Sequence, residues 1–310
     1  MTLYVAITVD ADNDDFSTSD QRNELSWRGL DLIPEIAGAV RDYNWRVTWF
    51  VRADTQIRKC YGSVAHLLDS LASTWRKLSD GGDEIGWHPH ILNQDKNGLW
   101  HSERDDRCFV DALRECHEGL RARGHRFNAV RVGEAAGSNL ILKTLVDLGL
   151  RVDSSAVPGR ARDDASRRFD WGPTSNKPYR PSISDYRIAG NPCLPIVEVP
   201  MTTLPVRARH EAQSFLRYVN LAYHPSIFLE SIEPWLESAD FKHGDQVLTL
   251  ILHPDELMPR DAAHSLYAFD LAALRSNLSG LDGLAKARRV EIAGVTVSQV
   301  ARISMPTAFR

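Results

Sequence analysis

The sequence has few cysteines, and their spacing excludes the usual forms of a disulfide framework or a structural zinc site. Only 4 cysteines occur in 310 residues, and none forms a CxxC pair. Small secreted domains need disulfides because their cores are small, whereas a chain of this length can bury a sufficient core. Structural zinc sites commonly use closely paired cysteines, which are missing here. We therefore expect free thiols at Cys60, Cys108, Cys116 and Cys193.

The chain also lacks long apolar runs and an excess of positive charge. No stretch approaches the roughly 18 consecutive apolar residues of a membrane span. The N-terminus shows no basic segment followed by an apolar segment and a cleavage site, the pattern of a secretory signal. The formal net charge of -4 gives no broad cationic field for nucleic acid. We therefore expect a cytoplasmic protein with no transmembrane segment and no nucleic-acid partner.

What the sequence does contain is a regular alternation of strand and helix patterns. With 43% hydrophobic and 25% charged residues, it has the composition of a globular enzyme. Short, nearly continuous apolar runs predict buried parallel strands at residues 3–10, 46–51, 83–87, 129–132, 151–153, 196–199 and 247–252. Segments with helical spacing separate many of these runs, at residues 29–43, 64–78, 105–123, 139–148 and 227–237, and further helices near Leu271 and Val300 close the chain.

The alternation predicts an α/β fold of about seven strand and helix units, in a single catalytic domain that spans residues 1–310. It lapses in residues 157–195, a stretch dense in Pro, Arg, Asp and Ser that is too long for a routine connection. We expect an irregular insertion there, on the substrate side. Its arginines between Arg160 and Arg187 would bind a phosphate or carboxylate of the substrate, or the insertion would be only a packed lid.

Acidic residues crowd the loop that follows the first predicted strand. These residues are Asp10, Asp12, Asp14 and Asp15. Four carboxylates at close range require a cation or shifted pKa values, unless their side chains point apart in an exposed turn. The cluster therefore indicates a metal site only in combination with other ligands.

Histidines follow two further predicted strands. His88 and His90, joined by Pro89, come directly after the strand at 83–87, and imidazole nitrogens are ligands for zinc, cobalt, nickel or iron. His253 ends the strand at 247–252, with Asp255 nearby, and is a candidate general acid or a histidine that caps a buried strand end. Because parallel α/β folds place their sites at the carboxyl ends of strands, these residues are expected to converge.

In this order along the chain, the segments resemble the motifs of the polysaccharide deacetylases of the NodB type. Residues 7–12, Ile-Thr-Val-Asp-Ala-Asp, are similar to the first motif, Thr-Phe-Asp-Asp-Gly, and residues 83–88 are similar to the approach to the second, His-Ser/Thr-x-x-His. Arg131 resembles the arginine of the third motif, Trp171 the tryptophan of the fourth, and His253 the histidine of the fifth. The resemblance spans roughly residues 3–255.

This resemblance implies a distorted (β/α)7 barrel with one divalent transition metal, zinc in first place and cobalt, nickel or iron(II) as alternatives. The implied ligands are Asp12, His88 and a second histidine. Asp10 would be the general base that takes a proton from water, and Arg131 would orient it. His253 would protonate the departing amine and would itself be steered by Asp255.

Two departures from the family's motifs concern the metal ligands. Ala11 separates the two aspartates, so Asp12 is taken as the ligand by analogy with subfamilies that show Asp-x-Asp. Leu92 stands where the second motif has its second histidine, and a leucine cannot bind a metal. His90 is the nearest substitute, and His101 or a carboxylate of the first loop is the alternative.

Two further residues are candidates for substrate binding. In the third motif, Val132-Gly133-Glu134 replaces the family's Pro-Tyr after the arginine, so Glu134 either faces the pocket or is an exposed loop carboxylate. Trp171 either forms a wall of the cleft by stacking on a sugar or packs the insertion.

The resemblance implies a metal-dependent hydrolase that removes an N-acyl group, usually N-acetyl, from an amino sugar. Without a secretory signal, the expected substrate is an N-acylated sugar, sugar nucleotide or lipid-linked glycan, as in surface-glycan biosynthesis. The alternatives are a hydrolase of another non-peptide C–N bond, a glycan-binding pseudoenzyme that has lost the metal, and a metal-independent glycoside hydrolase that uses two of the loop carboxylates.

Overall fold

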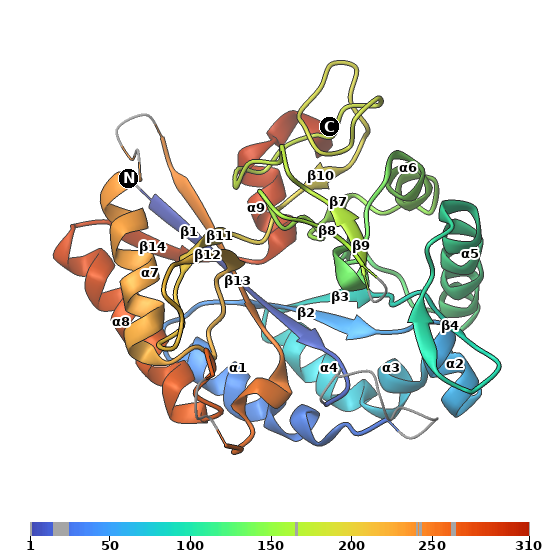
Figure 1. Ribbon diagram of the computed structural model, residues 1–310, viewed down its shortest axis with the longest axis horizontal. Helices are drawn as coiled ribbons and strands as arrows, with labels where there is room; N and C mark the ends of the chain where they lie inside the picture. The colour runs from blue at the N-terminus through green and yellow to red at the C-terminus, as the bar shows by residue number, and fades with distance from the viewer. Residues whose placement is uncertain are drawn as a thin grey trace.

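A parallel β-sheet forms the centre of the molecule. The computed structural model describes residues 2–14, 25–164, 167–239, 241, 244–261 and 265–309. The strands of the sheet follow the order β10-β7-β6-β3-β2-β1-β13 (Figure 1). They are β1 (Thr2–Ala11), β2 (Val47–Arg52), β3 (Glu84–His88), β6 (Ala129–Val130), β7 (Val152–Asp153), β10 (Val197–Glu198) and β13 (Gln246–Leu252). The seven strands predicted from the sequence are confirmed.

Irregular chain joins the two ends of this sheet. The amide of Thr202, just beyond β10, donates to the carbonyl of Thr249 in β13 at 3.0 Å. The amide of Leu221 donates to Ile251 in the same strand at 3.1 Å, and Val219 donates to Thr202 at 2.9 Å. The sheet therefore closes through segments that are not regular strands, which makes the molecule the distorted (β/α)7 barrel that the resemblance implied.

Helices surround the sheet, as Figure 1 shows. They are α1 (Ile33–Arg41), α2 (Thr55–Tyr61), α3 (His66–Ser70), α4 (Ala72–Asp80), α5 (Asp106–Ala122), α6 (Asn139–Asp147), α7 (Pro225–Ser238), α8 (Leu271–Ala287) and α9 (Val297–Ser304). Short 3-10 helices are η1 (Arg28–Leu32), η2 (Gly133–Ala135), η4 (Pro254–Leu257) and η5 (Pro306–Phe309). In α5, the Asp105 side chain caps the first turn by accepting from the amides of Arg107 and Cys108. The apolar face of α5, which includes Phe109 and Leu113, is buried.

Several short strands were not predicted from the sequence. β14 (Glu291–Gly294) pairs in parallel with the first half of β1. Three antiparallel pairs lie outside the main sheet: β4 (Leu92–Gln94) with β5 (Trp100–Ser102), β8 (Ala161–Asp163) with β9 (Arg168–Asp170), and β11 (Thr203–Val206) with β12 (Phe215–Tyr218). The insertion predicted at residues 157–195 thus contains the β8-β9 hairpin, and the described remainder of it is largely irregular.

The core explains why the strands read as nearly continuous apolar runs. In β1, Val5, Ile7 and Val9 are fully buried, and so are Ala6 and Thr8, which face the other way. A parallel strand that is covered on both faces has no solvent-exposed face, so its sequence does not alternate between apolar and polar residues. The four cysteines are free. In the described part of the chain, no helix has the length and apolar character needed to span a bilayer.

Candidate metal centre and active site

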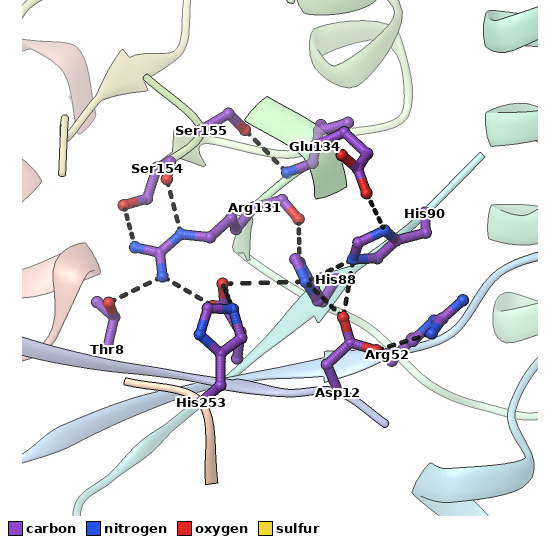
Figure 2. A network of polar contacts seen from close by, with 12 residues as sticks. Thr8, Asp12, Arg52, His88, His90, Arg131, Glu134, Ser154, Ser155 and His253 are labelled. Carbon is purple, nitrogen blue, oxygen red and sulfur yellow. Dashed lines mark hydrogen bonds and ion pairs between the residues drawn. The ribbon is translucent and has the colours of Figure 1, made fainter. Parts of the chain in front are cut away.

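The carboxyl ends of four sheet strands deliver polar side chains to one place. Asp10 lies near the end of β1, His88 ends β3, Arg131 follows β6, and His253 follows β13. Neighbouring parallel strands end at the same edge of a sheet, so residues far apart in sequence become neighbours. Figure 2 shows the resulting network of polar contacts.

Asp12, His88 and His90 form a compact group of metal-type donors. All three side chains are buried, and one ligand atom from each lies within 4.8 Å of the others. Nε2 of His90 is 3.0 Å from Nε2 of His88 and 3.1 Å from Oδ2 of Asp12, and Nε2 of His88 is 3.9 Å from that oxygen. Three donors held about 2.0–2.2 Å from a zinc ion at tetrahedral angles lie about 3.3–3.6 Å apart. The donor set and its spacing therefore fit a divalent transition metal.

The tautomer of His88 is fixed by the backbone. Its Nδ1 is 2.7 Å from the carbonyl oxygen of Arg131, so Nδ1–H donates and Nε2 is left as the acceptor that faces Asp12 and His90. Burial lowers the pKa of His88 to about 4. The ring is therefore neutral at neutral pH, which is the state in which imidazole binds metals.

The second histidine of the group is His90, and a glycine makes room for it. A Cβ built on Gly133 would lie 2.5 Å from three atoms of the His90 ring, so a larger residue at this position would displace the ring. The alternative ligand, His101, lies in β5, is exposed, and is 3.4 Å from Asp95. Of the two histidines weighed from the sequence as partner for His88, only His90 belongs to the group.

Arg52 holds the other side of Asp12 and was missed from the sequence. Its Nη1 donates to Oδ1 of Asp12 at 2.7 Å, and its Nε donates to Oδ2 of Asp54 at 2.8 Å. The same guanidinium also contacts Asn13 and Gln56, and the side chain is fully buried. Burial alone would raise the pKa of Asp12, but the charges of Arg52 and His90 hold it well below the usual range. Asp12 is therefore ionised, the state in which a carboxylate can bind a metal.

Asp10 is oriented by Arg131. Nη1 of Arg131 donates to Oδ1 of Asp10 at 2.7 Å and to the hydroxyl of Thr8 at 2.8 Å, while its other nitrogens bind Ser154 (Figure 2). The second oxygen, Oδ2, lies 3.9 Å from His88 Nε2 and 3.7 Å from His253 Nε2. Burial acts to raise the pKa of Asp10, but the charge of Arg131, together with electrostatic interactions with the His88 and His253 rings, outweighs it and lowers the pKa.

The carboxylate that contacts His253 is Glu256, and not Asp255 as the sequence predicts. Oε1 of Glu256 is 3.1 Å from Nδ1 of His253, and Oε2 accepts from the His253 amide at 2.8 Å. Asp255 instead forms an ion pair with Arg260 at 2.9 Å. Glu256 reaches the ring because η4 begins at Pro254, and its tight turn brings the third residue after His253 back to the imidazole. Burial lowers the pKa of His253, but the carboxylates of Glu256 and Asp10 raise it well above its usual value.

These side chains open into a cavity of about 360 Å³. Its lining combines the Asp12, His88 and His90 group with Asp10 and His253. The remaining wall includes arginines and aromatic residues of the β8-β9 and β11-β12 regions, among them Arg160, Phe169 and Tyr218. A small polar molecule therefore has access to the donor group and to both candidate proton-transfer residues.

Comparison with known proteins gives the fold its name. No protein-family model matches the chain, and no curated protein matches its sequence. A structure assigned as a polysaccharide deacetylase, from Mycobacterium smegmatis, matches with a TM-score of 0.54 at 19% identity over 98% of this chain and 91% of that one. The chain has the polysaccharide deacetylase fold. PuuE allantoinase matches with the same TM-score at 13% identity, again over 98% of this chain and 91% of that one.

Within this polysaccharide deacetylase fold, the two residues expected to bind substrate differ in position. Glu134 lines the cavity, with Oε1 3.7 Å from Nδ1 of His90 and Oε2 2.5 Å from Nε of Arg167. Trp171 is fully buried and does not line the cavity. Its Nε1 donates to the carbonyl of Ala135 at 2.8 Å, so the tryptophan supports the turn next to Glu134. The expectation that Trp171 stacks on a sugar is wrong in this arrangement, because the ring has no exposed face.

The first loop of the deacetylase fold uses its aspartates for different purposes. Asp10 and Asp12 enter the site, whereas Asp14 accepts from the amides of Arg28 and Gly29 at 2.9 and 2.7 Å and so anchors the start of η1. Asp15 lies outside the described residues. The crowding of carboxylates seen in the sequence is therefore relieved in part by a turn that directs Asp14 away.

Two buried carboxyl groups behind Arg131 were also missed from the sequence. Asp153 and Glu198 are register partners on β7 and β10, and both are fully buried. Burial raises the pKa of Asp153, and burial together with the charge of Asp153 raises the pKa of Glu198 well above its usual value. The fold therefore favours the protonated form of Glu198. Asp153 also binds the Ser155 hydroxyl, which accepts from the amide of Val132, so the pair supports the strand end that carries Arg131.

Proposed function

We propose that this protein is a metal-dependent hydrolase that removes an N-acyl group, N-acetyl in the first instance, from an amino sugar or its nucleotide-linked or lipid-linked conjugate, as in surface-glycan biosynthesis. The observation that carries the proposal is the buried group of Asp12, His88 and His90, with Asp10 and His253 beside it. The polysaccharide deacetylase fold is consistent with this reaction, and the order of the motifs in the sequence supports it.

Asp12, His88 and His90 are the residues that would hold the metal. One carboxylate and two imidazoles suit zinc, with cobalt, nickel or iron(II) as alternatives. Three protein ligands are typical of a catalytic site, because a position is left for water or substrate. When bound, such a metal supplies a Lewis acid that polarises the acyl carbonyl and lowers the pKa of water.

Asp10 is suited to the role of general base. Arg131 occupies its Oδ1, so Oδ2 is the oxygen directed toward His88 and His253. Its lowered pKa keeps the carboxylate ionised near neutral pH. In the proposed reaction, Oδ2 takes a proton from the attacking water as the water oxygen bonds to the acyl carbon.

His253 is suited to the role of general acid. Its raised pKa, maintained by Glu256 and Asp10, keeps the imidazole protonated near neutral pH. His253 donates this proton to the amide nitrogen as the C–N bond breaks, and the products are the free amine and the carboxylate of the acyl group. The base and the acid therefore begin in the protonation states that the reaction requires.

A substrate panel with a chelator tests this proposal. The zinc-loaded protein is incubated with N-acetylated monosaccharides, N-acetylated sugar nucleotides and allantoin. The release of acetate and the hydrolysis of allantoin are measured with and without a chelator. Allantoin is included because an allantoinase shares the fold. We expect acetate release that the chelator abolishes, and a loss of release in Asp10→Asn, which retains the metal. Activity that survives the chelator, or normal turnover by Asp10→Asn, would contradict the assignment.

Two of the three alternative functions predict different results in the same experiment. A glycan-binding pseudoenzyme would show no turnover with any substrate and no stoichiometric metal, and Asp12→Ala would leave its glycan affinity unchanged. A hydrolase of another non-peptide C–N bond would retain the metal and turn over a compound that is not an N-acetylated sugar.

A further inference from the structure

The cavity wall contains four arginines besides Arg131. They are Arg160, Arg162, Arg167 and Arg217. Three of them have carboxylate partners: Arg162 with Asp164, Arg167 with Glu134, and Arg217 with Glu211. These ion pairs satisfy three of the four guanidinium groups within the protein itself.

The carboxylates that line the cavity are also matched with cations. The pairs are Asp10 with Arg131, Asp12 with Arg52, Glu134 with Arg167, Asp255 with Arg260, and Glu256 with His253. Each acidic side chain of the lining therefore has a basic partner other than Arg160. A bound divalent metal would add further positive charge to the same space.

Arg160 is the cavity arginine that differs from the others. Among the residues that the structure describes, no carboxylate forms an ion pair with it. Its backbone is fixed by the amide of Trp171, which donates to the Arg160 carbonyl at 2.8 Å. The side chain is half-buried, and its guanidinium carbon lies 5.9 Å from the ring centroid of Tyr218, which lines the same cavity. A partly desolvated guanidinium without an anion favours one supplied by a ligand.

We propose that the substrate carries an anionic group, a phosphate or a carboxylate, and that Arg160 binds this group. The inference rests on the proposed hydrolase function for the rest of the substrate. A planar guanidinium beside an aromatic ring suits bidentate binding of either oxyanion. Arg160 holds the anion and does not touch the scissile amide, so its contribution appears in KM and in binding, and kcat is left nearly unchanged.

The test compares matched neutral and anionic ligands in three forms of the zinc-loaded protein. These forms are the wild type, Arg160→Gln and Arg302→Gln, an exposed arginine of α9 that does not line the cavity. The substrates are N-acetylglucosamine, its 1-phosphate and N-acetylmuramic acid, and acetate release gives KM and kcat. Calorimetric binding of the deacetylated products, glucosamine, glucosamine 1-phosphate and muramic acid, provides a second measurement that needs no turnover.

We expect Arg160→Gln to raise KM for the anionic substrate about 10- to 100-fold, the effect of losing a charge-assisted hydrogen bond, and to weaken the anionic product's binding equally. Arg160→Gln should leave KM and binding of the neutral compounds unchanged, and Arg302→Gln should match the wild type with every compound. The phosphate and carboxylate arms identify which oxyanion is bound. Tight, Arg160-dependent binding without acetate release would support the anion site and overturn the proposed reaction. Equal KM for neutral and anionic substrates in all three proteins would overturn the anion site and leave the reaction standing.

Discussion

Nη1 of Arg52 donates to Oδ1 of Asp12 at 2.7 Å, while Oδ2 of the same carboxylate lies 3.1 Å from Nε2 of His90. One oxygen of Asp12 is therefore held by a buried arginine, and the other is presented to the histidines. Such outer contacts fix the orientation of a ligand and are typical of metal sites. Arg52 is thus a positioning residue for the proposed metal site.

Substituting Arg52 by lysine tests this role. Lysine keeps the charge but cannot reproduce the contacts of the guanidinium with Asp12 and Asp54. We expect Arg52→Lys to weaken zinc binding about 10- to 100-fold, as measured by competition with a chromogenic chelator. The matched control is Arg41→Lys, which alters an ion pair with Asp83 outside the site and should bind zinc like the wild type. Unchanged affinity in folded Arg52→Lys would remove this positioning role.

The pair of His253 and Glu256 predicts a specific change in the pH profile. His253 acts as an acid only while protonated, so activity falls as the pH rises through its pKa. The carboxylate of Glu256 raises that pKa, so Glu256→Gln should lower it and move the basic limb of the kcat profile to lower pH. His253→Asn should reduce kcat about 100- to 10,000-fold.

Asp255→Asn is the control for the steering residue. Asp255 pairs with Arg260, so its amide variant should leave the basic limb in place. Steady-state rates across pH for both variants decide between the two carboxylates. A shift in Asp255→Asn without one in Glu256→Gln would restore the assignment made from the sequence.

How much the sequence predicts depends on how local the signal is. The seven strands were predictable because each buried parallel strand is a short apolar run, and the residues that follow each strand could be placed at one edge of the sheet. β14 was missed because Glu291–Gly294 is short and gains its stability from pairing with β1, about 290 residues away in the chain. That pairing has no local pattern.

The parts of the site that the sequence did not predict depend on side-chain partners across the fold. Arg52 ends an apolar strand, and nothing near it in the sequence indicates that it binds a carboxylate 40 positions earlier. Glu256 and Asp255 are adjacent, and only the geometry of η4 distinguishes them. Trp171 could be assigned to the cavity or the interior only once its hydrogen bond to Ala135 was known.

The buried carboxyl pair behind Arg131 predicts a pH-dependent stability. The folded-state pKa of Glu198 is raised, so folding favours its protonated form. Its contribution is therefore most favourable below the unfolded pKa of about 4.3 and declines as the pH rises above it. Glu198→Gln keeps a donor for Asp153 and cannot ionise, so it should be at least as stable as the wild type at pH 7.

Urea unfolding at pH 4.5 and pH 7 measures this effect. The difference in unfolding free energy between Glu198→Gln and the wild type should become more favourable to the variant at the higher pH. The control is Glu230→Gln, at an exposed position of α7, which should follow the wild type at both values. A Glu198→Gln variant that loses stability relative to the wild type as the pH rises would show that Glu198 is ionised in the fold.

Zinc titration of the metal-free protein by calorimetry, in the wild type, His90→Ala and His101→Ala, tests the proposed metal site most directly. His90 lies 3.0 Å from His88 within the donor group, whereas His101 is exposed beside Asp95. We expect one zinc per chain in the wild type and in His101→Ala, and an affinity at least about 100-fold weaker in His90→Ala. A wild type that binds no zinc, or a His90→Ala variant that binds it as tightly as the wild type, would show that Asp12, His88 and His90 do not together hold one metal ion.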